Sequence, residues 1–69
     1  MKLVDVRRNR VLSTRDLARE SGVSAKTINA IERGRTRPAF ATIRKLSMTL
    51  GVDPLEVDEF RDAIRNQSG

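Results

Sequence analysis

Residues 13–34 read STRDLARESGVSAKTINAIERG, two short amphipathic segments on either side of a glycine. Ser13 and Ser24 precede these segments, and a serine side chain in this position commonly accepts a hydrogen bond from a backbone amide in the first turn of a helix. Gly22 lies between the segments, where glycine can adopt a positive φ at no steric cost. The stretch therefore predicts two helices joined by a tight turn, over residues 14–20 and 25–33.

The apolar residues of this stretch indicate how the two helices pack. Two short helices joined through a glycine turn form the core of a helix-turn-helix. Ala18 is small enough to let the helices approach each other, and Val23 fills the angle between them. Leu17, Ile28 and Ile31 fix the second helix on the rest of the domain. The outward face of that helix has small or polar side chains, as a helix in the major groove requires: Ala25, Lys26, Thr27, Asn29 and Ala30.

The rest of the chain carries helix signals and only weak strand signals. We expect a helix over residues 2–9 and another over residues 39–50. A last helix begins with Asp53 as its N-cap and Pro54 in its first turn. Apolar residues at three- and four-residue spacing are the predicted core of this all-α fold: Leu3, Val6, Leu17, Ile28, Ile31, Phe40, Ile43, Leu46 and Leu50.

The length of 69 residues leaves room for one domain. We expect this domain to span residues 1–65 and to contain five helices, or six if a further one extends the last. Residues 66–69 should form a frayed C-terminal tail.

The charge of the chain is unevenly distributed. Residues 1–45 carry a net charge of +8 and residues 46–69 a net charge of −3. Eleven of the fourteen basic residues are arginine, whose planar guanidinium suits phosphates and guanine edges. A basic body with an acidic end favours a polyanionic partner on one side, although a generally solvated basic surface explains the same charges.

The composition excludes several classes of function. The chain has no cysteine and no histidine, which removes disulfides and thiolate or imidazole metal sites. With no clustered carboxylate pair either, no residue is a candidate for acid–base or nucleophilic catalysis. We therefore expect no metal, no cofactor and no enzymatic activity.

The apolar segments of the chain are short. None approaches the ~18 residues that cross a bilayer, and the N-terminus lacks the apolar core of a signal peptide. We expect a cytoplasmic protein without a membrane partner, associated with the nucleoid when it is bound to DNA.

These features together resemble the Cro and lambda-repressor (Xre-like) type of helix-turn-helix domain. The resemblance spans about Leu3 to Leu55 and implies a lambda-repressor-like, five-helix domain whose third helix reads double-stranded DNA. It rests on motifs in the order and spacing of the family: Leu17-Ala18, Gly22-Val23-Ser24, Ile28, Ile31-Glu32-Arg33-Gly34, Pro38, Leu46, Leu50-Gly51-Val52 and Leu55.

The resemblance also implies roles for individual residues. Side chains that would face or flank the base edges are Ala25, Lys26, Thr27, Asn29 and Ala30. Residues that would lie near DNA phosphates are Ser13, Thr14, Ser24, Arg33, Arg35 and Arg37. Arg7 and Glu32 match a pair that forms a partly buried ion pair between the first and third helices of relatives.

Four residues depart from the usual pattern of the family. Thr14 is shorter than the usual glutamine, so its contact with the DNA backbone is weaker or passes through water. Ala25 can offer only an apolar contact, for example to a thymine methyl. Val11 replaces a frequent glycine, and because β-branched residues resist positive φ we expect this turn to take another shape. Ala39 replaces the polar cap of the fourth helix, which costs ~1 kcal/mol unless another group substitutes.

The apolar residues near the C-terminus have two interpretations. They close the core of the domain, or they form a two-fold dimer surface, as the end of this domain does in many relatives. A dimer would place two third helices ~34 Å apart on a palindromic operator. These dimer candidates are Leu55, Val57, Phe60 and Ile64.

The sequence therefore predicts a transcriptional regulator that binds a specific sequence of double-stranded DNA. The first choice is a repressor, which would occupy its operator as a homodimer. The alternative is an antitoxin-like or other protein-interaction module whose last helix binds a protein partner.

Overall fold

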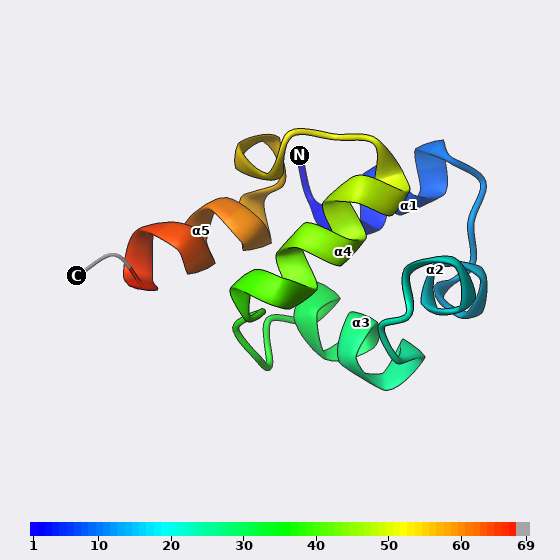
Figure 1. The fold of residues 1–69 in the computed structure, drawn as a ribbon, viewed down its shortest axis with the longest axis horizontal. Helices are drawn as coiled ribbons and strands as arrows, with labels where there is room; N and C mark the ends of the chain where they lie inside the picture. The colour runs from blue at the N-terminus through cyan, green and yellow to red at the C-terminus, as the bar shows by residue number, and fades with distance from the viewer. Residues whose placement is uncertain (68–69) are drawn as a thin grey trace.

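A computed structural model describes residues 1–67 of the chain. This part of the chain contains five α-helices, one short 3₁₀ helix and no strand, which confirms the all-α prediction (Figure 1). The elements are α1 (Leu3–Asn9), α2 (Thr14–Ser21), α3 (Ala25–Glu32), α4 (Phe40–Leu50), η1 (Pro54–Glu56) and α5 (Asp58–Gln67). None of the described helices is both long and apolar enough to cross a membrane.

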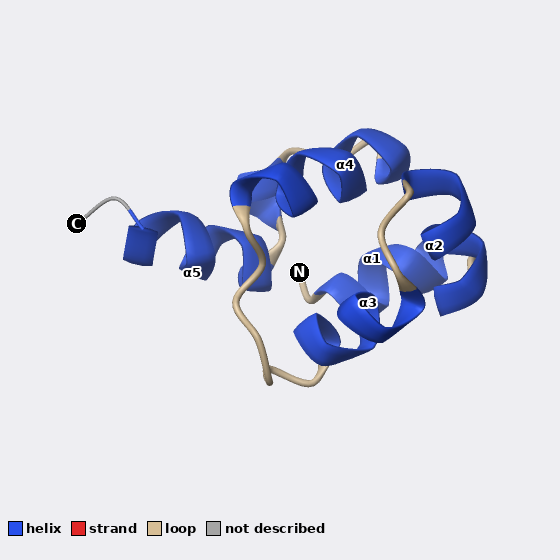
Figure 2. Ribbon diagram, turned by 60° about the horizontal axis from the view of Figure 1, so that its bottom comes forward, coloured by secondary structure: helices blue, strands red, loops and turns tan. Residues whose placement is uncertain are grey.

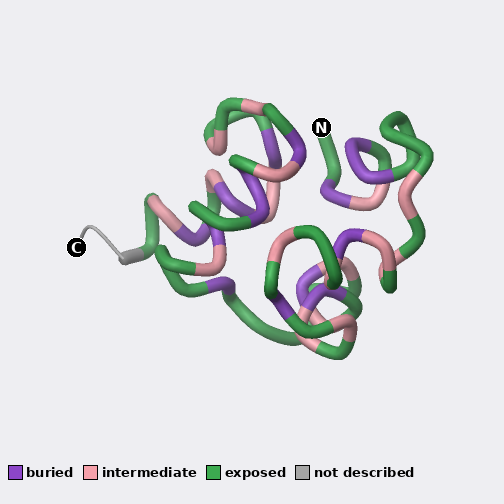
Figure 3. The backbone as a smooth tube through the Cα atoms, turned by 45° about the vertical axis from the view of Figure 1, so that its right-hand side comes forward, coloured by how far each residue is buried: buried purple, intermediate pink, exposed green. Residues whose placement is uncertain are grey.

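The helices enclose one hydrophobic core. Helices α1 to α4 form the body of the domain, and α5 extends away from it on one side (Figures 1 and 2). The buried segments of the helices face the interior, while the outer turns and loops are exposed (Figure 3). Buried hydrophobic residues come from every α-helix: Leu3, Val6, Leu17, Val23, Ile28, Ile31, Ile43, Leu46, Leu50, Val57, Phe60 and Ala63.

The predicted core is correct except at Phe40. Its side chain remains 49% exposed. Phe40 is the first residue of α4, and it lies on the rim of a surface groove between α4 and α5 instead of pointing into the body. Helical periodicity assigned it to the core because the spacing of apolar residues does not reveal which of them lie at the end of a packed face.

The C-terminal helix begins later than the sequence predicted. Asp53 does act as an N-cap, since its carboxylate accepts a hydrogen bond from the amide of Leu55 at 2.9 Å. The helix that follows is only the single 3₁₀ turn η1, and Val57 is extended before α5 starts. The extended residue turns the Val57 side chain into the core, where it is fully buried.

Residues 66–69 were predicted to form a frayed tail. α5 continues to Gln67, so it includes the first two residues of that segment. Residues 68 and 69 lie outside the described part of the chain.

The turn after α1 adopts the conformation that valine was expected to resist. Val11 has a φ of +57°, and its side chain is 89% exposed. The amide of Val11 donates to the carbonyl of Arg8 at 2.9 Å, and the amide of Leu12 donates to the carbonyl of Arg7 at 3.2 Å. These two bonds form the Schellman motif that usually has glycine at its left-handed position. The hydrogen bonds of the helix end therefore impose the left-handed conformation on a β-branched residue.

The first residues of the chain pack against the start of α5. The amino group of Met1 donates to the carbonyl of Glu56 at 2.7 Å and to Asp58 Oδ1 at 3.0 Å. In return, the amide of Asp58 donates to the carbonyl of Met1 at 2.7 Å. The hydrogen bond from the Met1 amino group lowers the pKa of Asp58. The carboxylate of Glu59 accepts a bond from the amide of Leu3 at 2.8 Å and so caps the start of α1.

Candidate nucleic-acid interface

The turn between α2 and α3 fixes the angle of the two helices. Gly22 adopts a φ of +80°, and its amide donates to the carbonyl of Ala18 at 2.9 Å, which ends α2. The amide of Val23 then donates to Ser21 Oγ at 3.1 Å, and the Val23 side chain is buried between the helices. The helix-turn-helix geometry expected from residues 13–34 is thus present, with α3 against α2 (Figures 1 and 2).

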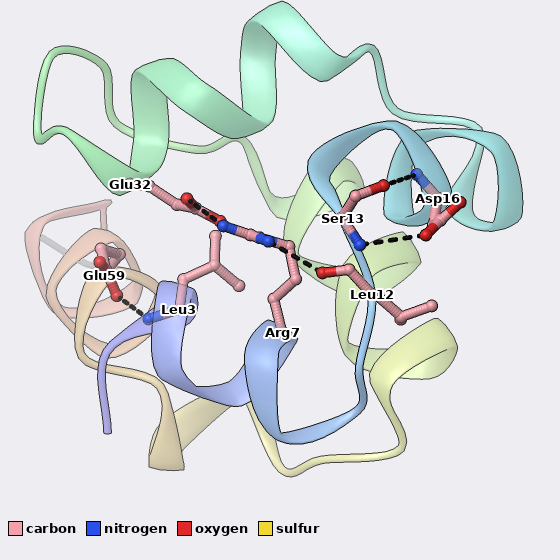
Figure 4. A network of polar contacts seen from close by, with 7 residues as sticks. All are labelled: Leu3, Arg7, Leu12, Ser13, Asp16, Glu32 and Glu59. Carbon is pink, nitrogen blue, oxygen red and sulfur yellow. Dashed lines mark hydrogen bonds and ion pairs between the residues drawn. The ribbon is translucent and has the colours of Figure 1, made fainter.

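Helix α3 is attached to the body by two isoleucines and an ion pair. Ile28 and Ile31 are fully buried. Arg7 of α1 binds Glu32 of α3 through two hydrogen bonds, from Nε to Oε2 at 2.8 Å and from Nη2 to Oε1 at 3.1 Å (Figure 4). The remaining guanidinium nitrogen, Nη1, donates to the carbonyl of Leu12 at 2.8 Å.

The surroundings of this ion pair make it rigid. The side chains of Arg7 and Glu32 are only 10% and 9% exposed. The hydrogen bonds to Glu32 raise the pKa of Arg7 above its ordinary value, so the guanidinium stays charged at any accessible pH. A bidentate, desolvated pair has one favoured geometry, and it therefore holds α3 at a fixed position relative to α1 and to the α1–α2 turn.

The outward face of α3 contains the five residues proposed to read or flank bases. Lys26 and Asn29 are exposed, and Ala25, Thr27 and Ala30 are half-buried. None of them belongs to the core. The eight residues of α3 span about 12 Å. This face is narrow: it carries the long cationic side chain of Lys26 and the amide side chain of Asn29 between small side chains.

Ser24 and Thr27 bind each other at the start of α3. Ser24 Oγ accepts a hydrogen bond from the Thr27 amide at 3.1 Å and donates one to Thr27 Oγ1 at 2.9 Å. The Ser24 hydroxyl is therefore committed to the cap, whereas the hydroxyl proton of Thr27 remains able to donate to an acceptor.

The start of α2 has a complete capping box. The Asp16 amide donates to Ser13 Oγ at 3.0 Å, and the Ser13 amide donates to Asp16 Oδ2 at 3.1 Å (Figure 4). These hydrogen bonds lower the pKa of Asp16. Ser13 is exposed and the neighbouring Thr14 is half-buried. Because the Ser13 amide is already bonded to Asp16, the groups that Ser13 and Thr14 can offer to a phosphate are their hydroxyls.

Three arginines lie just after α3. The carbonyls of Ile31 and Ala30 accept bonds from the Gly34 amide at 3.0 Å and the Arg35 amide at 2.9 Å, which closes the helix and reverses the chain. Pro38 is buried and so anchors the other end of the loop. Arg33 at the C-cap of α3 is exposed, and so are Arg35 and Arg37 in the loop. None of these arginines forms an ion pair with a described residue.

Acidic residues of α5 border this arginine loop. A hollow of about 320 Å³ is lined by Arg35 and Arg37 on the loop and by Glu59 and Asp62 on α5. Negative charge on α5 therefore borders the loop, and a polyanion would meet attraction along α3 and its loop but repulsion along this side of α5.

The C-terminal apolar residues divide into two groups. Val57 and Phe60 are fully buried, so they close the core and have no surface with which to contact a second copy. Of the four dimer candidates, only Leu55, which is 54% exposed, and the half-buried Ile64 retain accessible surface. Glu59 and Ala63 were not identified from the sequence, because one caps α1 across the fold and the other is a small core residue without a distinctive pattern.

Comparisons with known proteins agree with this geometry. A family model described as Helix-turn-helix matches residues 5–57. The chain is 36% identical over 62 residues to the HTH-type transcriptional regulator DdrOP3 of Deinococcus deserti. This alignment covers 86% of the chain and 48% of the relative, so the chain spans about half the length of that protein. No solved structure gives a significant match.

Proposed function

Because the chain belongs to the Cro/C1-type helix-turn-helix family, we propose that it regulates transcription by binding a specific sequence of double-stranded DNA. In this proposal α3 enters the major groove, and the protein acts as a repressor because it occupies an operator that the transcription machinery needs. The function is that of a DNA-binding regulator and not of an enzyme, and its place of action is the cytoplasm.

The observation that carries the proposal is a narrow polar helix face beside three unpaired arginines. Lys26 and Asn29 project from α3, which Arg7–Glu32 holds rigidly against the body. Lysine can donate to the N7 and O6 acceptors of guanine, and asparagine can pair with the edge of adenine. The arginines at 33, 35 and 37 would hold phosphates, and so set the register and supply salt-dependent affinity. Ala25 and Ala30 would add apolar contacts.

We further propose that two copies bind a palindromic operator. One α3 of about 12 Å reaches only a few base pairs, which is too short a site to be specific. A homodimer would read two half-sites one turn of DNA apart. Leu55 and the outer side of α5 are the surface that we assign to this contact, since Leu55 is apolar, exposed and on the acidic side of the molecule that DNA would avoid.

The experiment that tests this function is selection from a randomised duplex library, followed by a salt titration on the enriched sequence. We expect a palindrome with half-sites about one turn apart, and an affinity that falls steeply with salt. Lys26→Ala should weaken binding by about 1–3 kcal/mol and relax one base position in each half-site. Arg35→Ala should weaken binding to all sequences alike and reduce the salt slope by about one. If no sequence is enriched, the proposal fails, and the exposed Leu55 surface would then favour a protein-interaction module.

A further inference from the structure

A surface groove lies between α4 and α5, and it shares no lining residue with the hollow beside the arginine loop. Its volume is about 580 Å³, and most of its lining is apolar. Ile43 forms part of the lining, together with the exposed side chains of Phe40 and Met48 on α4 and the half-buried Ile64 on α5. The volume lies within the range of about 300–1,000 Å³ that small-molecule sites occupy.

Two polar groups of this groove lack partners. Ser47 is 6% exposed, and its hydroxyl oxygen is buried without a hydrogen-bond partner among the described residues. Arg44 lines the same groove and is exposed, with no carboxylate of the described residues in ion-pair contact. A buried hydroxyl without a partner is rare in folded proteins and calls for a specific explanation.

The positions of these two groups on α4 match a single small anion. Arg44 and Ser47 are three residues apart, so they are neighbours on one face of the helix, with Cβ atoms about 5–6 Å apart. A carboxylate there would accept from the Arg44 guanidinium with one oxygen and from the Ser47 hydroxyl with the other. Ser47 lines the groove, and binding requires its side chain to change rotamer so that the hydroxyl faces the head group. The apolar lining beyond them would hold a hydrocarbon or aromatic tail.

We propose that the α4–α5 groove is a binding site for a small amphipathic carboxylate. The head group binds Arg44 and Ser47, and the tail lies between Met48 and Ile64. A second copy of the chain fits the groove less well, because a two-fold contact centred on the groove would place two Arg44 side chains of like charge in one interface. This site is separate from α3 and from the arginine loop, so the inference does not depend on DNA binding.

The test is a titration of the full chain with octanoate, below its micelle concentration, followed by methyl and amide NMR. We expect saturable shifts at Met48, Ile43 and Ile64, and binding of the uncharged octanol that is weaker by about tenfold. Arg44→Met should also weaken octanoate binding by about tenfold, which is the effect of losing one charge-assisted hydrogen bond. Ser47→Ala should weaken it by a smaller factor and leave the fold intact, because it removes an oxygen that has no partner.

Lys45→Met is the matched control, since it removes the same charge from the next residue of α4, which does not line the groove. We expect octanoate to bind this variant as it binds the unmodified chain. The proposal is overturned if octanoate causes no saturable shift, if octanol binds equally well, or if Arg44→Met and Lys45→Met behave alike. It is also overturned if the groove signals shift with protein concentration alone, because a second copy then occupies the groove.

Discussion

The hydrogen bonds that hold the α2–α3 unit and those that hold the C-terminal segment from η1 to α5 differ greatly in how far apart their partners lie in sequence. In the first, the caps of both helices join residues that are three apart in sequence. In the second, the start of α5 is tied to the first residues of the chain by hydrogen bonds between residues 55 to 57 apart. A local hydrogen bond forms as soon as its own helix forms. The start of α5, in contrast, can be fixed only when the two ends of the domain have come together.

This difference determines which changes each region tolerates. Each cap or turn of the α2–α3 unit should contribute stability in a small step, and the exception is Glu32, whose buried partner Arg7 belongs to α1. The docking of α5 should depend on a few buried side chains whose loss affects the whole domain. Four substitutions test this expectation, from the largest effect to the smallest.

Phe60→Ala should have the largest effect. Phe60 is fully buried between α5 and the body, and removing a buried phenylalanine costs about 3–5 kcal/mol. A domain of this length has a total stability on the order of 3–10 kcal/mol, so we expect thermal unfolding, followed by circular dichroism, to lose most of its cooperativity. Leu55→Ala is the control, since Leu55 is half-exposed and its loss should lower the melting temperature only slightly. Similar melting curves for the two variants would show that α5 is not docked through Phe60.

Glu32→Ala should follow. It leaves the Arg7 guanidinium buried beside α3 without its carboxylate, and breaking a buried pair costs about 3 kcal/mol or more. We expect a large loss in urea-unfolding free energy. The double variant Arg7→Met with Glu32→Leu should recover much of this loss, because no charge is then left buried. If the double variant is as unstable as the sum of both single changes, the penalty does not come from an unpaired charge.

Ser13→Ala should cost about 1 kcal/mol, the usual value of an N-cap, and should also change the response to acid. The bonds from Ser13 lower the pKa of Asp16 in the folded state. A lowered folded-state pKa stabilises the protein above the unfolded value of about 4, and this stability is lost as the pH falls through the folded-state pKa. We therefore expect the melting temperature of Ser13→Ala to fall less between pH 5 and pH 2 than that of the unmodified chain.

Ser24→Ala is the matched control for this acid effect. It removes an N-cap of the same kind from α3, but no carboxylate takes part in that cap. Asp58, whose pKa is also lowered, is present in all three proteins. The fall of the melting temperature between pH 5 and pH 2 should therefore be the same in Ser24→Ala as in the unmodified chain. If this fall becomes smaller in both Ser13→Ala and Ser24→Ala, then Asp16 is not the titrating group.

The same difference in reach explains what the sequence could predict. The limits of α2 and α3 follow from Ser13, Gly22 and Ser24, whose effects act within one helical turn, and the prediction of these helices is confirmed to within one residue. The start of α5 and the exposure of Phe40 are set by contacts across the fold. The capping signal of Asp53 and Pro54 therefore placed the start of the last helix too early, and periodicity placed Phe40 in the core. The residues proposed to read bases could be recognised as a polar face, but the sequence offers no local signal for the α4–α5 groove.

Val11→Gly should have the smallest effect and the opposite sign. Val11 holds a φ of +57° with an exposed side chain that makes little contact. Glycine would remove a left-handed penalty of about 1–2 kcal/mol, offset in part by about 0.5–1 kcal/mol of extra chain entropy in the unfolded state. We expect a melting temperature a few degrees higher, by roughly 4–8 °C for each kcal/mol gained.

Gly22→Val is the reverse exchange at a comparable turn, which has a φ of +80° and no heavy atom within 4 Å of the added Cβ. It should lower the melting temperature, since it introduces the backbone penalty that Val11→Gly removes. Opposite shifts of the melting temperature in the two variants would show that these local turns affect stability through backbone conformation alone. If Val11→Gly melts at or below the temperature of the unmodified chain, then the Val11 side chain contributes contacts that its 89% exposure does not suggest.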